Sequence, residues 1–64
     1  MAQWQMVEVV GSSSQSIQEA VRVAVRAARV RTAKWFEVRE IRGVVTDGEV
    51  GEFQVRVAVG YETS

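Results

Sequence analysis

Cysteine and histidine are both absent from this 64-residue sequence. Without cysteine no disulfide can form, and without either residue type a zinc site is excluded. A single core of this size supplies only about 3–5 kcal/mol of stability unless something else stabilises it. Oligomerisation is the remaining common means. We therefore expect one domain, residues 1–64, that assembles with copies of itself.

Long apolar segments are also lacking. No apolar run approaches the roughly 18 residues of a membrane span, and no signal peptide opens the chain. Eight basic residues balance eight acidic ones, so the chain as a whole has no general attraction for nucleic acid. Only a basic block between Arg22 and Lys34 could contact nucleic acid. We expect a soluble cytoplasmic protein with neither a membrane nor nucleic acid as a partner.

The first half of the chain predicts a strand followed by a helix. Residues 4–10 alternate as a strand that Gly11 ends, and the helix is expected from about residue 14 to about residue 32. Ser13 is the preferred N-cap, and Ser16 with Glu19 forms an alternative capping box. Apolar residues cover more than half of the helix circumference, so a neighbouring subunit is expected to cover part of this face.

The second half predicts two strands, residues 34–43 and 53–61, joined through a turn at Asp47 and Gly48, with a bulge suggested at Gly51. Gln54 is then expected opposite residues 39–41. The predicted fold is α+β with the order β-α-β-β. Its three-stranded antiparallel sheet, in the order 1-3-2, wraps around one helix.

Alternation along these two strands divides their residues between two faces. The core face is predicted to carry Phe36, Val38, Phe53, Val55, Val57, Val59 and Tyr61. The other face is predicted to carry Trp35, Glu37, Arg39, Ile41 and Gln54. A large aromatic side chain outside the core, Trp35, requires an explanation.

Residues for catalysis are poorly represented. No histidine is present to act as a general base, and the serines at positions 12–14 and 16 are better explained as helix caps. Glu37 and Glu40 point to opposite faces of one strand, so they are not a catalytic pair. Asp47 and Glu49 lack the ligand spacing of a calcium loop. We expect neither an enzyme nor a metal site.

Three residues are suited to binding a planar ligand. The Trp35 indole can stack on a heteroaromatic ring, and Gln54 offers both an amide donor and a carbonyl acceptor to a base or flavin edge. Arg42 is a natural partner for a phosphate. From the residues alone, structural roles are favoured: Trp35 as an interface anchor, Gln54 as a polar strand residue and Arg42 in an ion pair.

Three blocks of the sequence closely resemble the dodecins, which are small flavin-binding proteins that assemble as hollow dodecamers. The blocks are W-x-M-V-E-V-V-G-S-S at residues 4–13, W-F-E-V-x-x-I-R-G at 35–43, and D-G at 47–48 followed by F-Q-V-x-V-x-V-G-Y at 53–61. They occur in order over nearly the whole chain, and the second and third together are specific to this family.

The resemblance implies that flavin stacks on Trp35, that Gln54 binds the flavin edge, and that Arg42 approaches the phosphate of FMN. It implies two antiparallel flavins across a two-fold axis, between tryptophans of neighbouring subunits of a homododecamer. FMN is the expected ligand, with riboflavin or FAD as alternatives. The implied role is storage, buffering and protection from light, without turnover.

Two features differ from the dodecin pattern. The segment between Gly11 and Trp35 is a couple of residues shorter, which bears on the pocket around Trp35. Glu62 stands where some bacterial relatives carry a basic residue, so coenzyme A is a doubtful ligand. The alternative is that the protein keeps the dodecin fold, serves in assembly or interaction, and has lost flavin binding. A nucleic-acid binder using Arg22, Arg26 and Arg29 is a weaker third hypothesis.

Overall fold

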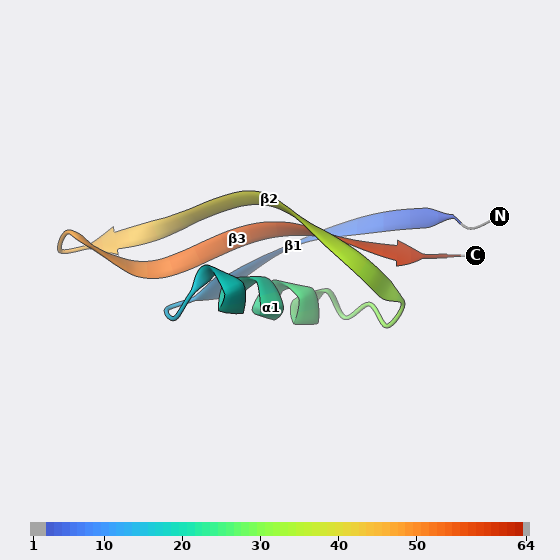
Figure 1. Cartoon of the computed structure of the whole chain (residues 1–64), viewed down its shortest axis with the longest axis horizontal. Coiled ribbons are helices and arrows are strands. Elements are labelled where there is room, and N and C mark those ends of the chain that lie inside the picture. The colour runs from blue at the N-terminus through green and yellow to red at the C-terminus, as the bar shows by residue number, and fades with distance from the viewer. Residues whose placement is uncertain (1–2, 64) are drawn as a thin grey trace.

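The computed structural model describes residues 3–63, which form a long, narrow molecule of 52 × 16 × 12 Å. Its elements are β1 (Trp4–Ser13), α1 (Ile17–Ala28), β2 (Ala33–Thr46) and β3 (Glu49–Glu62). All three strands are antiparallel to their neighbours, in the order β1-β3-β2, and α1 lies along one face of the sheet (Figure 1). The predicted fold class is confirmed.

The core lies between α1 and the strands β1 and β3. Its buried members are Ala20, Ala24, Val55, Val57 and Val59. Small alanines let the helix approach β1 closely, and a Cβ on Gly11 would lie only 2.3 Å from the carbonyl oxygen of Ala20. Gly11 therefore allows this close approach and does not end the strand, which continues to Ser13. The predicted end of the first strand was wrong for this reason.

The helix is shorter than predicted at both ends. Its N-cap is Ser16, whose Oγ accepts a hydrogen bond of 3.0 Å from the Glu19 amide, so the choice of Ser13 was wrong. Ser13 Oγ instead accepts from the amides of residues 15 and 16, which stabilises the turn before the helix. At the other end Arg29 adopts a left-handed conformation (φ 54°) and stops the helix. The next strand begins at Ala33, so residues 29–32 are needed as a connection.

The hairpin between β2 and β3 turns at the predicted residues. Asp47 (φ 54°) and Gly48 (φ 79°) both have positive φ, as a two-residue type I′ turn requires. Gly51 is a bulge, because Val44 pairs with Glu52 whereas Val45 pairs with Val50. The bulge moves the register by one residue, so Gln54 lies opposite Arg42 and not opposite residues 39–41 as predicted.

A second bulge occurs at Arg39 on β2. Val38 pairs with Val57 and Glu40 pairs with Arg56, which leaves Arg39 without a partner residue on β3. The extra residue reverses the alternation beyond it. Ile41 therefore lies opposite the core residue Val55, and its predicted place on the face of Trp35 was wrong. Glu40 lies opposite Arg56 and Glu37 lies opposite Ala58, so the prediction that these two glutamates point to opposite faces was also wrong.

The residues that β2 contributes to the helix side are only partly covered. Phe36 and Val38 lie opposite the core residues Val59 and Val57, yet they are 53% and 36% exposed. The reason is that α1 packs mainly against β1 and β3. Among the described residues, no helix has the length and apolar character needed to cross a bilayer.

Candidate functional site

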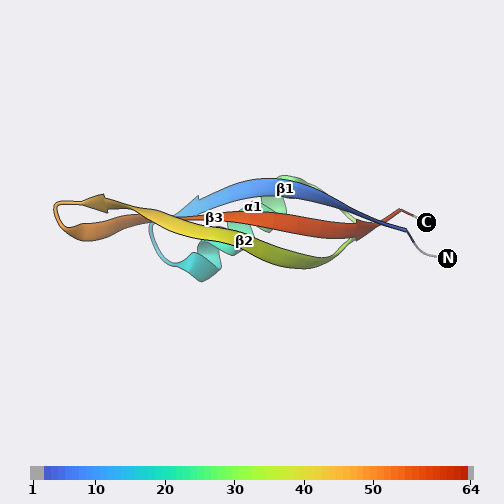
Figure 2. The same ribbon diagram turned by 90° about the horizontal axis from the view of Figure 1, so that it is seen from above.

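The candidate site lies on the outer face, which we define as the face of the sheet turned away from α1. Along β3 this face consists of Gln54, Arg56, Ala58 and Gly60, and the strands on either side contribute the residues paired with them. Figure 2 shows the three strands of this face crossing the molecule side by side. Two groups of functional side chains occur on it, one at each end.

The first group is centred on Trp35, which lies opposite Gly60 in the register. A Cβ on Gly60 would lie 2.1 Å from Cε2 of the indole and 2.2 Å from Cζ2. The indole therefore lies directly on the Gly60 backbone, where only glycine leaves room for it. The side chain remains 40% exposed. Trp35 thus presents an aromatic surface whose position is fixed by a glycine on the neighbouring strand.

Trp4 and Met6 extend this aromatic surface from β1. The ring centroids of Trp4 and Trp35 are 6.3 Å apart, with an angle of 46° between the ring planes. Met6 pairs with Gly60 from the side opposite to Trp35. We call Trp4, Met6 and Trp35 the tryptophan patch. Sequence reasoning gave Trp4 no part in the site, because only the register between β1 and β3 brings it to Trp35.

The second group is a bonded pair, Arg42 and Gln54. Arg42 Nε donates a hydrogen bond of 3.0 Å to Gln54 Oε1. The bond occupies the amide oxygen of Gln54 and leaves its NH₂ group available as a donor, together with the terminal nitrogens of Arg42. Within residues 3–63 Arg42 forms no ion pair.

A hollow of about 230 Å³ adjoins this pair. Its lining consists of Val10, Glu40, Arg42, Gln54, Val55 and Arg56. It combines an apolar wall with three charged groups and an amide, which is suitable for the polar edge or phosphate of a ligand.

The two groups lie on one face but are well separated. Gln54 and Gly60 are six residues apart on β3, which corresponds to about 20 Å along a strand. Trp35 is therefore remote from Gln54 within one chain. The structure unites Arg42 with Gln54 and sets Trp35 apart from both.

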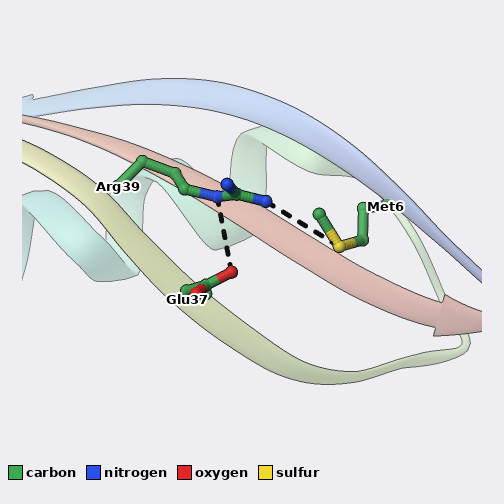
Figure 3. Close-up of polar contacts among 3 residues, drawn as sticks. All are labelled: Met6, Glu37 and Arg39. Atoms are coloured by element: carbon green, nitrogen blue, oxygen red, sulfur yellow. Dashed lines mark hydrogen bonds and ion pairs between the residues drawn. The ribbon is translucent and has the colours of Figure 1, made fainter.

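Charged side chains occupy the middle of the outer face. Arg39 Nε lies 3.4 Å from Glu37 Oε1, and an Arg39 terminal nitrogen contacts the Met6 sulfur at 4.0 Å. Figure 3 shows the Arg39 side chain reaching across the sheet toward Met6. Arg56 Nε lies 3.9 Å from Glu40 Oε1. These exposed pairs contribute little stability, but they keep the middle of the face polar.

A larger groove, of about 760 Å³, lies on the other side of the molecule between α1 and β2. It is lined by Gln18, Glu19, Val21, Arg22, Val25, Arg26 and Phe36. Its apolar floor is the part of the helix that the sheet does not cover. None of the three predicted binding residues lines it.

Comparison with known proteins identifies a family model described as Dodecin that matches residues 4–64. The dodecin of Thermus thermophilus is 40% identical over 60 residues, which are 91% of this chain and 87% of that protein. A crystal structure of an arginine-to-alanine variant of that dodecin has 36% identity and a TM-score of 0.91, covering 100% of this chain and 97% of the other. The dodecin from Streptomyces davaonensis has 29% identity and a TM-score of 0.88, with 98% and 96% covered.

Proposed function

The chain belongs to the dodecin family, and on this basis we propose that residues 1–64 form a non-catalytic flavin-binding unit that stores and sequesters FMN, riboflavin or FAD between subunits of a homododecamer. The observation that carries the proposal is the exposed Trp35 indole seated on Gly60, on the same face as the Arg42–Gln54 pair. FMN is the ligand we favour. The cytoplasmic location expected from the sequence stays a prediction.

Trp35 provides the stacking surface in this proposal. Stacking of a base on an aromatic side chain contributes about 1–3 kcal/mol, and a tricyclic flavin offers a comparable planar face. The indole has no side chain beneath it, because it rests on the backbone of Gly60. It is therefore already held in an orientation that leaves it accessible to a planar ligand.

Gln54 and Arg42 provide the polar contacts. The pyrimidine edge of a flavin alternates carbonyl and N–H groups, and the free NH₂ of Gln54 can donate to one of its carbonyls. The hydrogen bond from Arg42 fixes the orientation in which that NH₂ points away from the arginine. The terminal nitrogens of Arg42 can bind the phosphate of FMN. Coenzyme A is not part of the proposal.

The distance between the two groups supports a site shared by two chains. Trp35 lies opposite Gly60, and about 20 Å of β3 separates Gly60 from Gln54. This distance exceeds the length of a flavin ring system. One ring cannot touch both residues of the same chain. A second copy brought across a two-fold axis can supply Gln54 and Arg42 to a flavin stacked on the first copy's Trp35.

Assembly is supported by apolar surface that a single chain leaves uncovered. The hairpin arm, residues 43–52, extends beyond α1 (Figure 1), and its Val44, Val45 and Val50 are 42%, 68% and 59% exposed. Near the α1 groove, Glu19 Oε1 is buried and has no hydrogen-bond partner among the described residues. Light scattering should give a mass near that of a dodecamer, and a stable monomer at micromolar concentration would contradict the proposal.

The binding test is a titration of FMN with apo-protein while the flavin emission is followed. We expect strong quenching at saturation, because an indole in van der Waals contact can donate an electron to the excited flavin. Trp35→Ala should nearly abolish binding, and Trp35→Phe should retain part of it, since a phenyl ring still stacks. Unquenched emission at saturation, or parental affinity of Trp35→Ala, would reduce Trp35 to an interface residue.

An absorbance spectrum of the freshly purified protein tests the proposal against the alternative of an assembly protein without ligand. A flavin that remains bound through purification gives bands in the visible range. Protein that is colourless as purified and also fails to bind added FMN would favour the alternative.

A further inference from the structure

Trp4 has no role in the core of the molecule. It is 48% exposed and lies on the outer face at the start of β1, opposite Glu62 of β3. The core beneath α1 does not include it. An exposed tryptophan close to a strand end needs another explanation, and its neighbour on the outer face offers one.

That neighbour is Trp35, which reaches Trp4 across the middle strand. β1 and β2 are not adjacent, since β3 lies between them. At the level of Trp35 the residue of β3 is Gly60, which has no side chain to separate the two indoles. The ring centroids therefore approach to 6.3 Å at 46°. This lies within the 4.5–7 Å range of favourable tilted aromatic pairs.

We propose that Trp4 is a positioning residue that holds the Trp35 indole flat against Gly60. Gly60 supports the ring from below, and Trp4 restricts its movement along the sheet from the side. A ring ordered before binding loses less conformational freedom when a ligand stacks on it. Trp4 thereby raises the affinity of Trp35 for a planar ligand without itself needing to contact that ligand.

The effect on Trp35 can be measured without flavin. Trp4 and Trp35 are the only tryptophans in the chain, so Trp35 is the sole tryptophan in both Trp4→Phe and Trp4→Ala. Phenylalanine keeps an aromatic ring beside Trp35, whereas alanine removes it. Trp35 should show lower emission anisotropy and greater quenching by acrylamide in Trp4→Ala than in Trp4→Phe. Equal values in the two variants would overturn the inference.

The consequence for binding rests on the proposed function and is tested with FMN. Loss of a favourable aromatic pair predicts that Trp4→Ala binds FMN about threefold to tenfold more weakly than the parent. Trp4→Phe should stay within about twofold, since most of the pair is kept. The matched control is Gln5→Ala, on the same strand, where the lost contact is a hydrogen bond of 2.9 Å from Tyr61. Its affinity should equal that of the parent.

Two results separate this inference from the proposed function. Parental FMN affinity of Trp4→Ala, in a protein that does bind FMN, would overturn the positioning role of Trp4. Failure of the parent to bind any flavin would overturn the proposed function, and the anisotropy and acrylamide comparison alone would then decide whether Trp4 holds Trp35 in place. Light scattering on each variant confirms that the compared proteins have the same mass.

Discussion

Gly60 controls the position of the proposed stacking surface, and Gly60→Ala tests this directly. Gly60 does not have positive φ, so alanine can adopt its backbone conformation. The added Cβ would lie 2.1 Å from Cε2 of Trp35, whereas non-bonded carbons prefer about 3.5–4.0 Å. The indole must therefore retreat by about 1.5 Å to restore a normal contact. Trp4 occupies the adjoining surface and limits where the ring can go.

Displacement of the indole should weaken the binding of FMN while leaving the fold intact. Losing most of one stacking contact of about 1–3 kcal/mol corresponds to about 5-fold to 150-fold weaker binding. The stability of the apo-protein should change little. Alanine gains about 0.4–1 kcal/mol by making the unfolded chain less flexible, and this gain offsets part of the cost of displacing the Trp35 indole, which is partly exposed and lies outside the core. Quenching of FMN emission gives the affinity, and urea unfolding at one fixed protein concentration gives the stability.

The matched control is Gly51→Ala, which makes the same change on the same strand. There the nearest atom to the added Cβ is the side-chain oxygen of Thr46 at 3.1 Å, far from Trp35. Gly51 does not have positive φ, so alanine can keep the bulge that sets Arg42 opposite Gln54, and FMN affinity should remain that of the parent. If Gly60→Ala binds and quenches FMN as the parent does, either the indole does not rest on Gly60 or Trp35 is not the stacking residue.

Three further predictions concern the second group of the site and the helix. Arg42→Ala should weaken the binding of FMN more than the binding of riboflavin, because riboflavin lacks the phosphate, whereas Gln54→Ala should weaken the binding of both ligands equally. If Arg42→Ala loses equal affinity for the two ligands, the role of the arginine is limited to orienting Gln54. Ser16→Ala should lower the free energy of unfolding in urea by about 1 kcal/mol, and the exposed Ser14→Ala should not, so equal stabilities would refute Ser16 as the N-cap. Gly11→Ala should destabilise by about 1–3 kcal/mol, because its Cβ would meet the helix backbone, and an unchanged urea midpoint would contradict the close approach.

Local sequence signals predicted the order of the elements because each signal acts within a few residues. Asp47 and Gly48 tolerate positive φ, which fixes the turn, and the alternating valines identify β3. The same locality explains the errors at Ser13 and Gly11. Ser13 is as good a cap as Ser16 when judged alone, and Gly11 resembles a strand end until the helix that packs on it is known.

The pair of bulges explains why sequence reasoning placed Trp35 correctly and Ile41 incorrectly. Gly51 adds one residue to β3, and Arg39 adds one residue to β2. The two insertions lie on opposite strands of the hairpin, so from Val38 back to Trp35 the register is that of an uninterrupted two-residue hairpin. Trp35 consequently meets Gly60 just as simple counting from the turn requires.

Between the two bulges the register is displaced by one residue, and the Arg42–Gln54 pair forms in this segment. Simple counting from the turn would set Arg42 opposite Phe53 and Ile41 opposite Gln54. The observed register sets Arg42 opposite Gln54 and Ile41 opposite Val55, so the arginine joins the amide on the outer face while the apolar residue turns to the helix side. A bulge at Gly51 alone would carry the displacement on to Trp35 and move it off Gly60. The second bulge at Arg39 is what permits one hairpin to present both the seated indole and the Arg42–Gln54 pair on a single face.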